Sequence, residues 1–291
     1  MDAPPDKEAV LPFITIARHL EDIGIRATHI LAQNTEQGFV LLEDMGDSTF
    51  TRLLDQKEDE ITLYTRAINT LAKIHKNAQS VKTKSTSYKI PEYDVNHICE
   101  EVLLFTHWYL AAINLKPVDP DGKKEFIDLW QKSFEALPDI GTTLVLRDYH
   151  VDNLMMHQDE CVVLDFQDAL TGSPAYDVVS LLEDARRDIG DEIFQQTYQH
   201  YLKSMPKLNR SDFAHHFAFW GAQRHCKVAG IFTRLWLRDS KPNYLAHLPR
   251  VIRLMFKSLE HPALAQLKQW FEDQGVEKKH PGFDTQPKTP I

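Results

Sequence analysis

The chain has 291 residues, 43% of them hydrophobic and 26% charged, which excludes collagen-like, coiled-coil and disordered proteins. Its 42 acidic residues outnumber its 33 basic residues, and the formal net charge of -9 argues against general nucleic-acid binding. The three cysteines are far apart and form no CxxC pair, so neither a disulfide framework nor a redox motif is indicated. No apolar run approaches the roughly 20 residues of a membrane span, and no signal peptide is visible, so we expect a cytoplasmic protein.

The spacing of apolar residues predicts the elements in chain order. A helix is expected over 10–20, ended by Gly24, then two strands near 29–32 and 38–42, and a long helix from Ile61 to His75. After a polar loop over 79–91, further helices are expected over 96–112 and 122–135. A buried strand over 142–146, a polar loop over 147–153 and a hairpin with strands 154–156 and 161–166 follow. The remainder is predicted as helix: 178–185, 191–204, 211–238 and 246–272.

The most informative motif lies in the polar loop and the hairpin after it. Asp148 follows a strand, Asn153 comes five residues later, and the hairpin returns the chain to Asp165. Carboxylate and amide oxygens brought together in this way suit Mg²⁺, and the acid at the start of the loop is placed to accept a hydroxyl proton. This division of labour is that of phosphoryl transfer, and the order Asp-x4-Asn, hairpin, Asp parallels the HRD and DFG motifs of protein kinases.

These motifs resemble those of the aminoglycoside phosphotransferase and choline kinase superfamily, which has a protein-kinase-like fold. Similarity also covers Gly38 to Gly46, the segment from Ser173 to Asp188, and parts of 223–250, so it touches most of the chain. Within the superfamily, the chain looks most like the bacterial anomeric kinases that phosphorylate N-acetylmuramate and N-acetylglucosamine at C1 in cell-wall recycling. The resemblance implies ATP and Mg²⁺ as cofactors and a small sugar as substrate, with no nucleic-acid, membrane or obligate protein partner.

The resemblance also assigns roles to single residues. Asp148 becomes the catalytic base, Asn153 and Asp165 the Mg²⁺ ligands, and Asp177 the acid that supports the catalytic loop. A hinge whose backbone contacts adenine corresponds to Glu43, Asp44 and Met45. Candidate substrate contacts are Arg147, His150, Asp152, Arg187 and Arg224. Where the superfamily commonly has His-Gly before the catalytic Asp, this chain has Leu146-Arg147, which brings a permanent cation next to the site.

The expected fold is α+β: a protein-kinase-like, two-lobed fold with a truncated N-lobe over 1–46, a mostly helical C-lobe over 47–275, and a flexible tail over 276–291. Met1–Pro5 resembles the end of the third N-lobe strand. The hairpin that covers the phosphates and the lysine of that third strand therefore have no counterpart, and we expect the 291-residue chain to bind ATP weakly.

Several alternatives stay open at this stage. The chain could phosphorylate another sugar, choline or an aminoglycoside, act as a catalytically impaired binding module, or be a metal-dependent hydrolase that needs no ATP. Asp177 could simply cap the next helix, and Arg224 could lie on an exposed helix face. A zinc cluster of His150, Asp152 and His157 is disfavoured, because alternate side chains along a strand point apart.

Overall fold

The computed structural model describes residues 1–4, 9–77, 88–114 and 117–277. The chain divides into two compact units, one formed by 1–92, 141–184 and 189–208, and the other by 93–140, 185–188 and 209–291. Parts of the predicted loop over 79–91 and of the predicted tail over 276–291 lie outside the described residues. The predicted lobe boundary at residue 46 stays a prediction.

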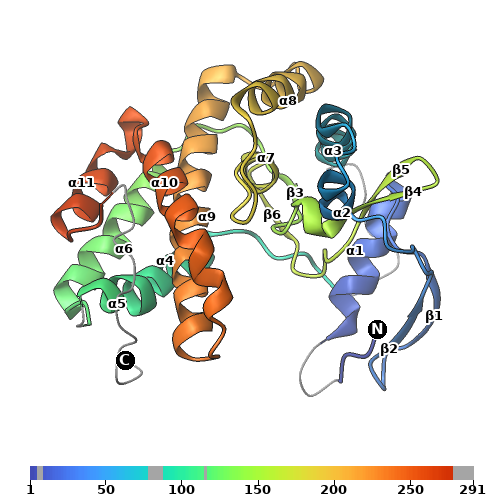
Figure 1. Cartoon of the computed structure of the whole chain (residues 1–291), viewed down its shortest axis with the longest axis horizontal. Coiled ribbons are helices and arrows are strands. Elements are labelled where there is room, and N and C mark those ends of the chain that lie inside the picture. Colours follow the sequence, from blue (N-terminus) through green and yellow to red (C-terminus); the bar gives the residue numbers. More distant parts are fainter. Residues whose placement is uncertain (5–8, 78–87, 115–116, 278–291) are drawn as a thin grey trace. The chain divides into compact units, whose positions relative to one another are not determined.

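The first unit combines helices with short antiparallel strand pairs, which confirms the predicted mixture of helix and strand (Figure 1). Its helices are α1 (Val10–Asp22), α2 (Phe50–Asp55), α3 (Glu60–Asn77), α7 (Ala175–Leu182) and α8 (Asp191–Ser204). Its strands are β1 (Ile30–Asn34), β2 (Phe39–Leu42), β3 (Thr143–Val145), β4 (Leu154–His157), β5 (Glu160–Val163) and β6 (Leu170–Gly172), paired as β1–β2, β3–β6 and β4–β5.

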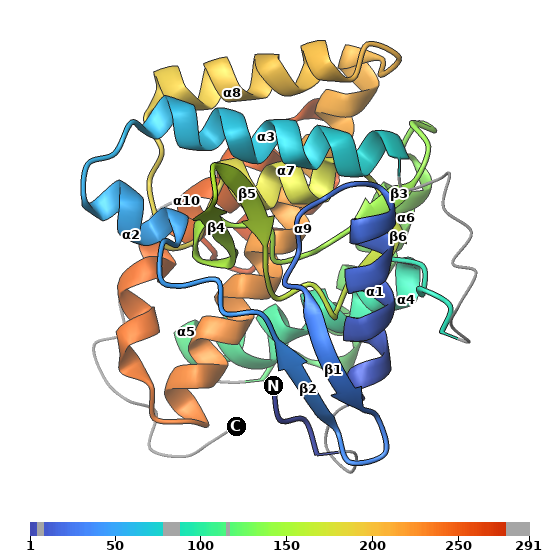
Figure 2. The same ribbon diagram turned by 90° about the vertical axis from the view of Figure 1, so that its right-hand side faces the viewer.

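The N-terminal part of this unit places α1 beside the β1–β2 hairpin, as both views show (Figures 1 and 2). The helix ends at Asp22, and the chain turns away from it at Gly24, whose φ of 72° lies in the left-handed region that only glycine adopts without a steric cost. The first residues extend the sheet: Ala3 donates its N–H to the Gly38 carbonyl at 3.0 Å, and Val40 donates to Met1 at 3.1 Å. The N-terminal segment is therefore attached to β2 by an antiparallel bridge between Asp2 and Phe39, and its assignment to the end of an N-lobe strand stays a prediction.

Two long helices, α3 and α8, run side by side in this unit (Figure 2). Near the end of α3, the buried ring of His75 shares a hydrogen bond of 2.7 Å with the hydroxyl of Tyr201 from α8. The β4–β5 hairpin turns through Gln158 and Asp159, both with positive φ, which is the geometry of a two-residue turn. Both the hairpin and the helix over 191–204 lie where the sequence predicts them.

The second unit is helical in the part that the structure describes. It contains α4 (Val95–Leu104), a π-helical segment (Phe105–Leu110), α5 (Ala111–Asn114), α6 (Pro120–Glu135), α9 (Arg210–Leu237), α10 (Leu248–Leu259) and α11 (Ala265–Asp273). The helix predicted over 246–272 is interrupted at Pro262, because proline has no N–H to donate and forces His261 into an extended conformation (ψ 130°). Among the described residues, no helix combines the length and the apolar character that a membrane span requires.

Candidate active site

A buried carboxylate anchors the loop between β3 and β4 through hydrogen bonds to its backbone. Asp177, in the first turn of α7, accepts the backbone N–H groups of Leu146 at 2.7 Å and Arg147 at 2.9 Å. Its side chain is fully buried, and Nε2 of His75 lies 3.9 Å from one of its oxygens. A buried carboxylate that accepts two backbone donors ties the start of the loop to α7 and does not cap that helix.

This anchoring explains the backbone conformation at Arg147. Its φ of 69° is unusual for a residue with a side chain and costs of the order of 1–3 kcal/mol. The conformation is held from both sides, because the N–H of Arg147 is bonded to Asp177 and its carbonyl accepts the Ser180 hydroxyl at 3.2 Å. The strained turn delivers the next residue, Asp148, from the strand into the loop.

The side chain of Asn153 joins the backbone of Asp148 to the carboxylate of Asp165. The amide nitrogen of Asn153 donates to the Asp148 carbonyl at 3.0 Å and to the carboxylate of Asp165 at 3.3 Å. The backbone joins the two segments again, because Leu164 donates its N–H to the Asn153 carbonyl at 2.9 Å. The structure therefore brings together two residues 12 positions apart in the chain, and their role as metal ligands stays a prediction.

Asp165 itself sits on a second strained position, with φ at 55°. Its other carboxylate oxygen accepts the side-chain amide of Gln167 at 2.8 Å, so each oxygen already has one donor. A carboxylate offers about four lone-pair sites, which leaves acceptor capacity on both oxygens. The carboxylate is thus oriented by two amides while it remains exposed to solvent.

The segment after β2 holds the candidate hinge. Glu43 accepts two hydrogen bonds from Arg26, at 2.7 and 2.8 Å, and its N–H donates to the His29 carbonyl at 2.9 Å. Asp44 accepts the N–H of Gly46 at 2.9 Å, and this turn requires glycine because φ at Gly46 is 71°. These contacts fix the segment 43–46 between the strand and α2.

An apolar cluster lies against the hinge. Met45, Met155 and Val162 are buried together. Leu164, the residue before Asp165, packs against them. The bridge between Thr49 and Met155, together with the hydrogen bond from Met156 to the Ser48 carbonyl (2.9 Å), attaches β4 to the chain that follows the hinge. The hairpin that carries Asp165 therefore also supplies an apolar surface next to the hinge backbone.

The loop residues that are candidates for substrate binding form interactions with other parts of the chain. The guanidinium of Arg147 donates to the Asp168 carbonyl at 3.4 Å, across to the segment that follows Asp165. The ring of His150 is buried, 4.0 Å from the carboxylate of Asp152, and Asp152 accepts the hydroxyl of Thr51 from α2. Asp152 thus joins the loop to α2, which sequence patterns do not predict.

The remaining candidates, Arg187 and Arg224, belong to the second unit, and their role as substrate contacts stays a prediction. Arg224 is only 5% exposed on α9, so it does not lie on the exposed helix face that was the alternative. One turn further along, Lys227 pairs at 2.7 Å with Glu101 of α4, which also accepts the Gln223 amide at 2.7 Å.

The side chains of this loop can be compared with the ligands that a divalent cation requires. Among the described residues, no group of three or more His, Cys, Asp or Glu side chains is placed to hold a metal, so the zinc cluster is not formed. One carboxylate and one amide are what Mg²⁺ uses when nucleotide phosphates and water complete its octahedral shell. Asn153 and Asp165 fit that arrangement.

Comparison with known proteins identifies the family. Residues 1–212 match the model of the phosphotransferase enzyme family. The chain belongs to this family. A relative named N-acetylmuramate/N-acetylglucosamine kinase from Neisseria meningitidis is 34% identical over 268 residues, which cover 88% of this chain and 76% of the relative. A protein of the same name from Pseudomonas aeruginosa is 34% identical over 279 residues, 92% of this chain and 79% of that protein.

Solved structures show the fold. Amicoumacin kinase, solved with AMP-PNP and Ca²⁺, superposes with a TM-score of 0.59 at 18% identity over 89% of this chain and 80% of that chain. A choline/ethanolamine kinase family protein from Mesorhizobium loti gives a TM-score of 0.58 at 12% identity, over 88% of this chain and 81% of that chain. The predicted protein-kinase-like fold is confirmed, and the predicted class of enzyme, a phosphotransferase, is confirmed by the family.

Several site residues were not predicted. Ser180, Thr51 and Arg26 each bond a candidate residue from more than 15 positions away, and no local spacing reveals such pairs. Gln167 stands where protein kinases have the glycine of DFG, and that substitution was the one available signal that this position contacts Asp165.

Proposed function

We propose that the chain catalyses ATP- and Mg²⁺-dependent transfer of the γ-phosphoryl group to the anomeric hydroxyl of N-acetylmuramate or N-acetylglucosamine. The observation that carries this proposal is that the Asn153 amide joins the backbone carbonyl of Asp148, at 3.0 Å, to the carboxylate of Asp165, at 3.3 Å. The names of the relatives, which match about nine tenths of this chain, support the choice of sugar.

In this proposal Asp148 orients the attacking hydroxyl and accepts its proton. Its position is set by the strained turn at Arg147, which Asp177 and Ser180 hold. General-base catalysis by a positioned carboxylate contributes about 10² to 10⁴ in rate. Because the loop is tied to α7 before any substrate arrives, little ordering is left to occur at the moment of reaction.

Asn153 and Asp165 would hold the Mg²⁺, which neutralises the charge on the nucleotide phosphates. Gln167 and the Asn153 amide orient the Asp165 carboxylate through bonds of 2.8 and 3.3 Å. The backbone of Glu43 to Met45 would bind the adenine, with the cluster of Met45, Met155, Val162 and Leu164 as its apolar surface. Arg147, next to the base, is the candidate partner for a phosphate or for the substrate carboxylate.

A substrate panel tests the proposal. The full chain, ATP and Mg²⁺ are incubated with N-acetylmuramate, N-acetylglucosamine, choline or an aminoglycoside, and ADP release is measured. We expect ADP release with the two N-acetylated sugars and none without an acceptor. Turnover with choline or the aminoglycoside alone would replace the sugar as the proposed substrate, and metal-dependent hydrolysis of any of these compounds in an assay without ATP would indicate a hydrolase. Binding of ATP without turnover on any acceptor would indicate an impaired kinase-like binding module.

A further inference from the structure

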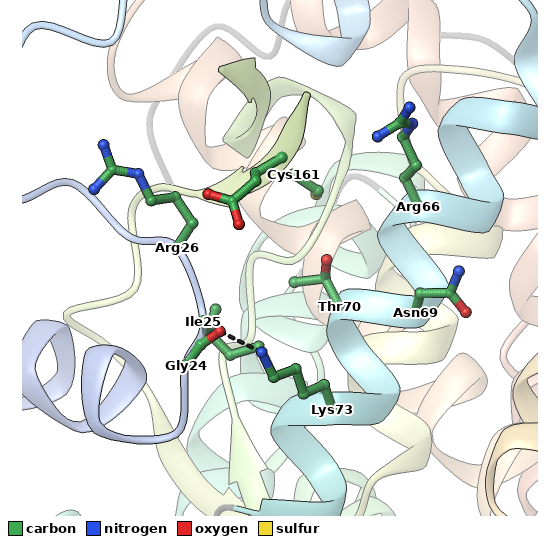
Figure 3. A pocket seen from close by; sticks show the side chains of 9 residues that line it. Gly24, Ile25, Arg26, Arg66, Asn69, Thr70, Lys73 and Cys161 are labelled. Carbon is green, nitrogen blue, oxygen red and sulfur yellow. Dashed lines mark hydrogen bonds between the residues drawn. The ribbon is translucent and has the colours of Figure 1, made fainter. Parts of the chain in front are cut away.

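A cavity in the first unit, whose lining includes none of Asp148, Asn153 and Asp165, has three basic side chains in its wall. It measures about 270 Å³ and is bounded by the loop after α1, by α3 and by the start of β5 (Figure 3). Its lining includes Arg26, Arg66 and Lys73 but only one acidic residue, Glu160. A basic cavity is unusual on a chain whose formal net charge is -9. Its positive charges attract a negatively charged ligand.

Two of the basic side chains have only neutral partners. Arg66 and Lys73 lie seven residues apart on the same face of α3, and they donate to the backbone carbonyls of Asp159 and Gly24 (Figure 3). In the part of the chain that the structure describes, neither forms an ion pair with a carboxylate. Arg26 differs, because its guanidinium is bonded to Glu43. Two positive charges beside the cavity are therefore left without a counter-charge.

The other lining groups do not supply that charge. Burial raises the pKa of the Cys161 thiol to about 12, so the thiol stays neutral and is a poor nucleophile. The Asn69 amide points away from the cavity and bonds His200 at 2.7 Å. The hydroxyl of Thr70 points toward β5, where it is a hydrogen-bond partner of the Cys161 side chain (Figure 3).

We propose that this cavity is a second ligand site, separate from the candidate active site, which binds a small phosphate-bearing anion through Arg66 and Lys73. A guanidinium and an ammonium both bind phosphate oxygens. Because Arg66 and Lys73 lie two turns, about 10 Å, apart along α3, each marks one end of the cavity, and a phosphate group can be bound by either. The volume is just below the 300 to 1,000 Å³ or so of pockets for drug-sized ligands, so the occupant is inorganic phosphate or a phosphorylated monosaccharide.

The site touches both parts of the candidate active site. Arg26, on its wall, bonds Glu43 of the hinge, and β5 runs from Cys161 to the residues before Asp165. An anion in the cavity attracts Arg26 and weakens its bond to Glu43. Occupancy is therefore expected to lower the affinity for adenosine, a consequence that rests on the proposed hinge, whereas anion binding itself does not.

Calorimetry on the full chain tests the site, with inorganic phosphate and glucose 6-phosphate as separate probes. We expect binding of at least one probe; binding of phosphate alone identifies the free ion as the ligand, and tighter binding of glucose 6-phosphate identifies a sugar phosphate. The double variant Arg66→Met/Lys73→Met should weaken binding by about tenfold or more, and Glu160→Gln should strengthen it. Lys76→Met, which removes one positive charge from α3 outside the cavity, is the control for the single variant Lys73→Met and should bind as the wild type does.

The variants also separate this site from the candidate catalytic site. Lys73→Arg keeps the charge and should retain binding. A urea denaturation curve of the double variant that matches the wild type excludes misfolding as the reason for its loss of binding. Equal affinity of the wild type and the double variant, or no binding of either probe at millimolar concentration, would overturn the proposal. If a bound anion leaves the affinity for adenosine unchanged, only the link to the hinge is overturned, and the anion site stands. The proposed kinase function is tested independently, by activity on the sugar panel.

Discussion

Replacing Asp177 by asparagine is expected to loosen the catalytic loop. The carboxylate accepts the N–H groups of Leu146 and Arg147 at 2.7 and 2.9 Å in a fully buried position. An asparagine of the same shape keeps one acceptor oxygen but turns an NH₂ group toward the other N–H. One bond to a charged group is lost, which costs about 1.5–3 kcal/mol, and a buried N–H is left without an acceptor, which costs about 1–3 kcal/mol.

The net loss of unfolding free energy is expected to be about 2–4 kcal/mol, because the neutral amide no longer bears the desolvation cost of a buried charge. The assay is urea denaturation of the variant, combined with hydrogen exchange at the amides of residues 146 and 147. We expect faster exchange at these two amides as well as lower stability. Asp191→Asn, which changes an exposed acid at the start of α8, is the control and should cost no more than about 1 kcal/mol.

A loss below about 1 kcal/mol in Asp177→Asn, with exchange at the two amides unchanged, would refute this reasoning. It would mean that the strained φ of 69° at Arg147 is held by other contacts, and that the carboxylate is not the anchor of the loop. The bond from Ser180 to the Arg147 carbonyl, at 3.2 Å, would then be the first to examine.

Three further predictions follow from the same geometry. Asp165→Asn should raise the Mg²⁺ concentration needed for nucleotide binding, and an unchanged Mg²⁺ titration would remove this residue from the metal site. Gly230→Ala should lower stability by about 2 kcal/mol or more, because the added Cβ lies 2.4 Å from the backbone carbon of Leu104, whereas Gly190→Ala meets open space; denaturation curves compare the two. Two arginines lower the pKa of Asp188 below its ordinary 3.8, so its contribution to stability is present at neutral pH and is lost as the pH falls through that lowered value. Asp188→Asn should therefore be less stable than the wild type at pH 7, with the difference vanishing in acid.

Patterns that are local in the chain were predictable. The helical period placed α1 and α8, and the alternation around a polar turn placed the hairpin of β4 and β5. The hairpin between Asn153 and Asp165 predicted that these two residues meet, since a hairpin brings its two ends together. Such inferences need only one short segment and the geometry of its backbone.

Contacts between distant segments were not predictable in the same way. The short elements α2 and β6 carry too few residues for a clear period, and β6 is stabilised by pairing with β3 from 27 residues earlier. The partners Arg26 and Glu43, and Thr51 and Asp152, are brought together only by the fold. Arg224 reads as an exposed helix residue, yet the packing around α9 buries it. In each case tertiary contact decides the outcome.

The central claim is that Asp148 accepts the proton of an anomeric hydroxyl during phosphoryl transfer. The most direct measurement is ³¹P NMR of the product formed from ATP, Mg²⁺ and N-acetylmuramate by the wild type and by Asp148→Asn. We expect a product phosphorus coupled to the anomeric proton in the wild type, formed about 10² to 10⁴ times more slowly by the variant. Phosphate on another hydroxyl, or wild-type turnover by Asp148→Asn, would contradict the account.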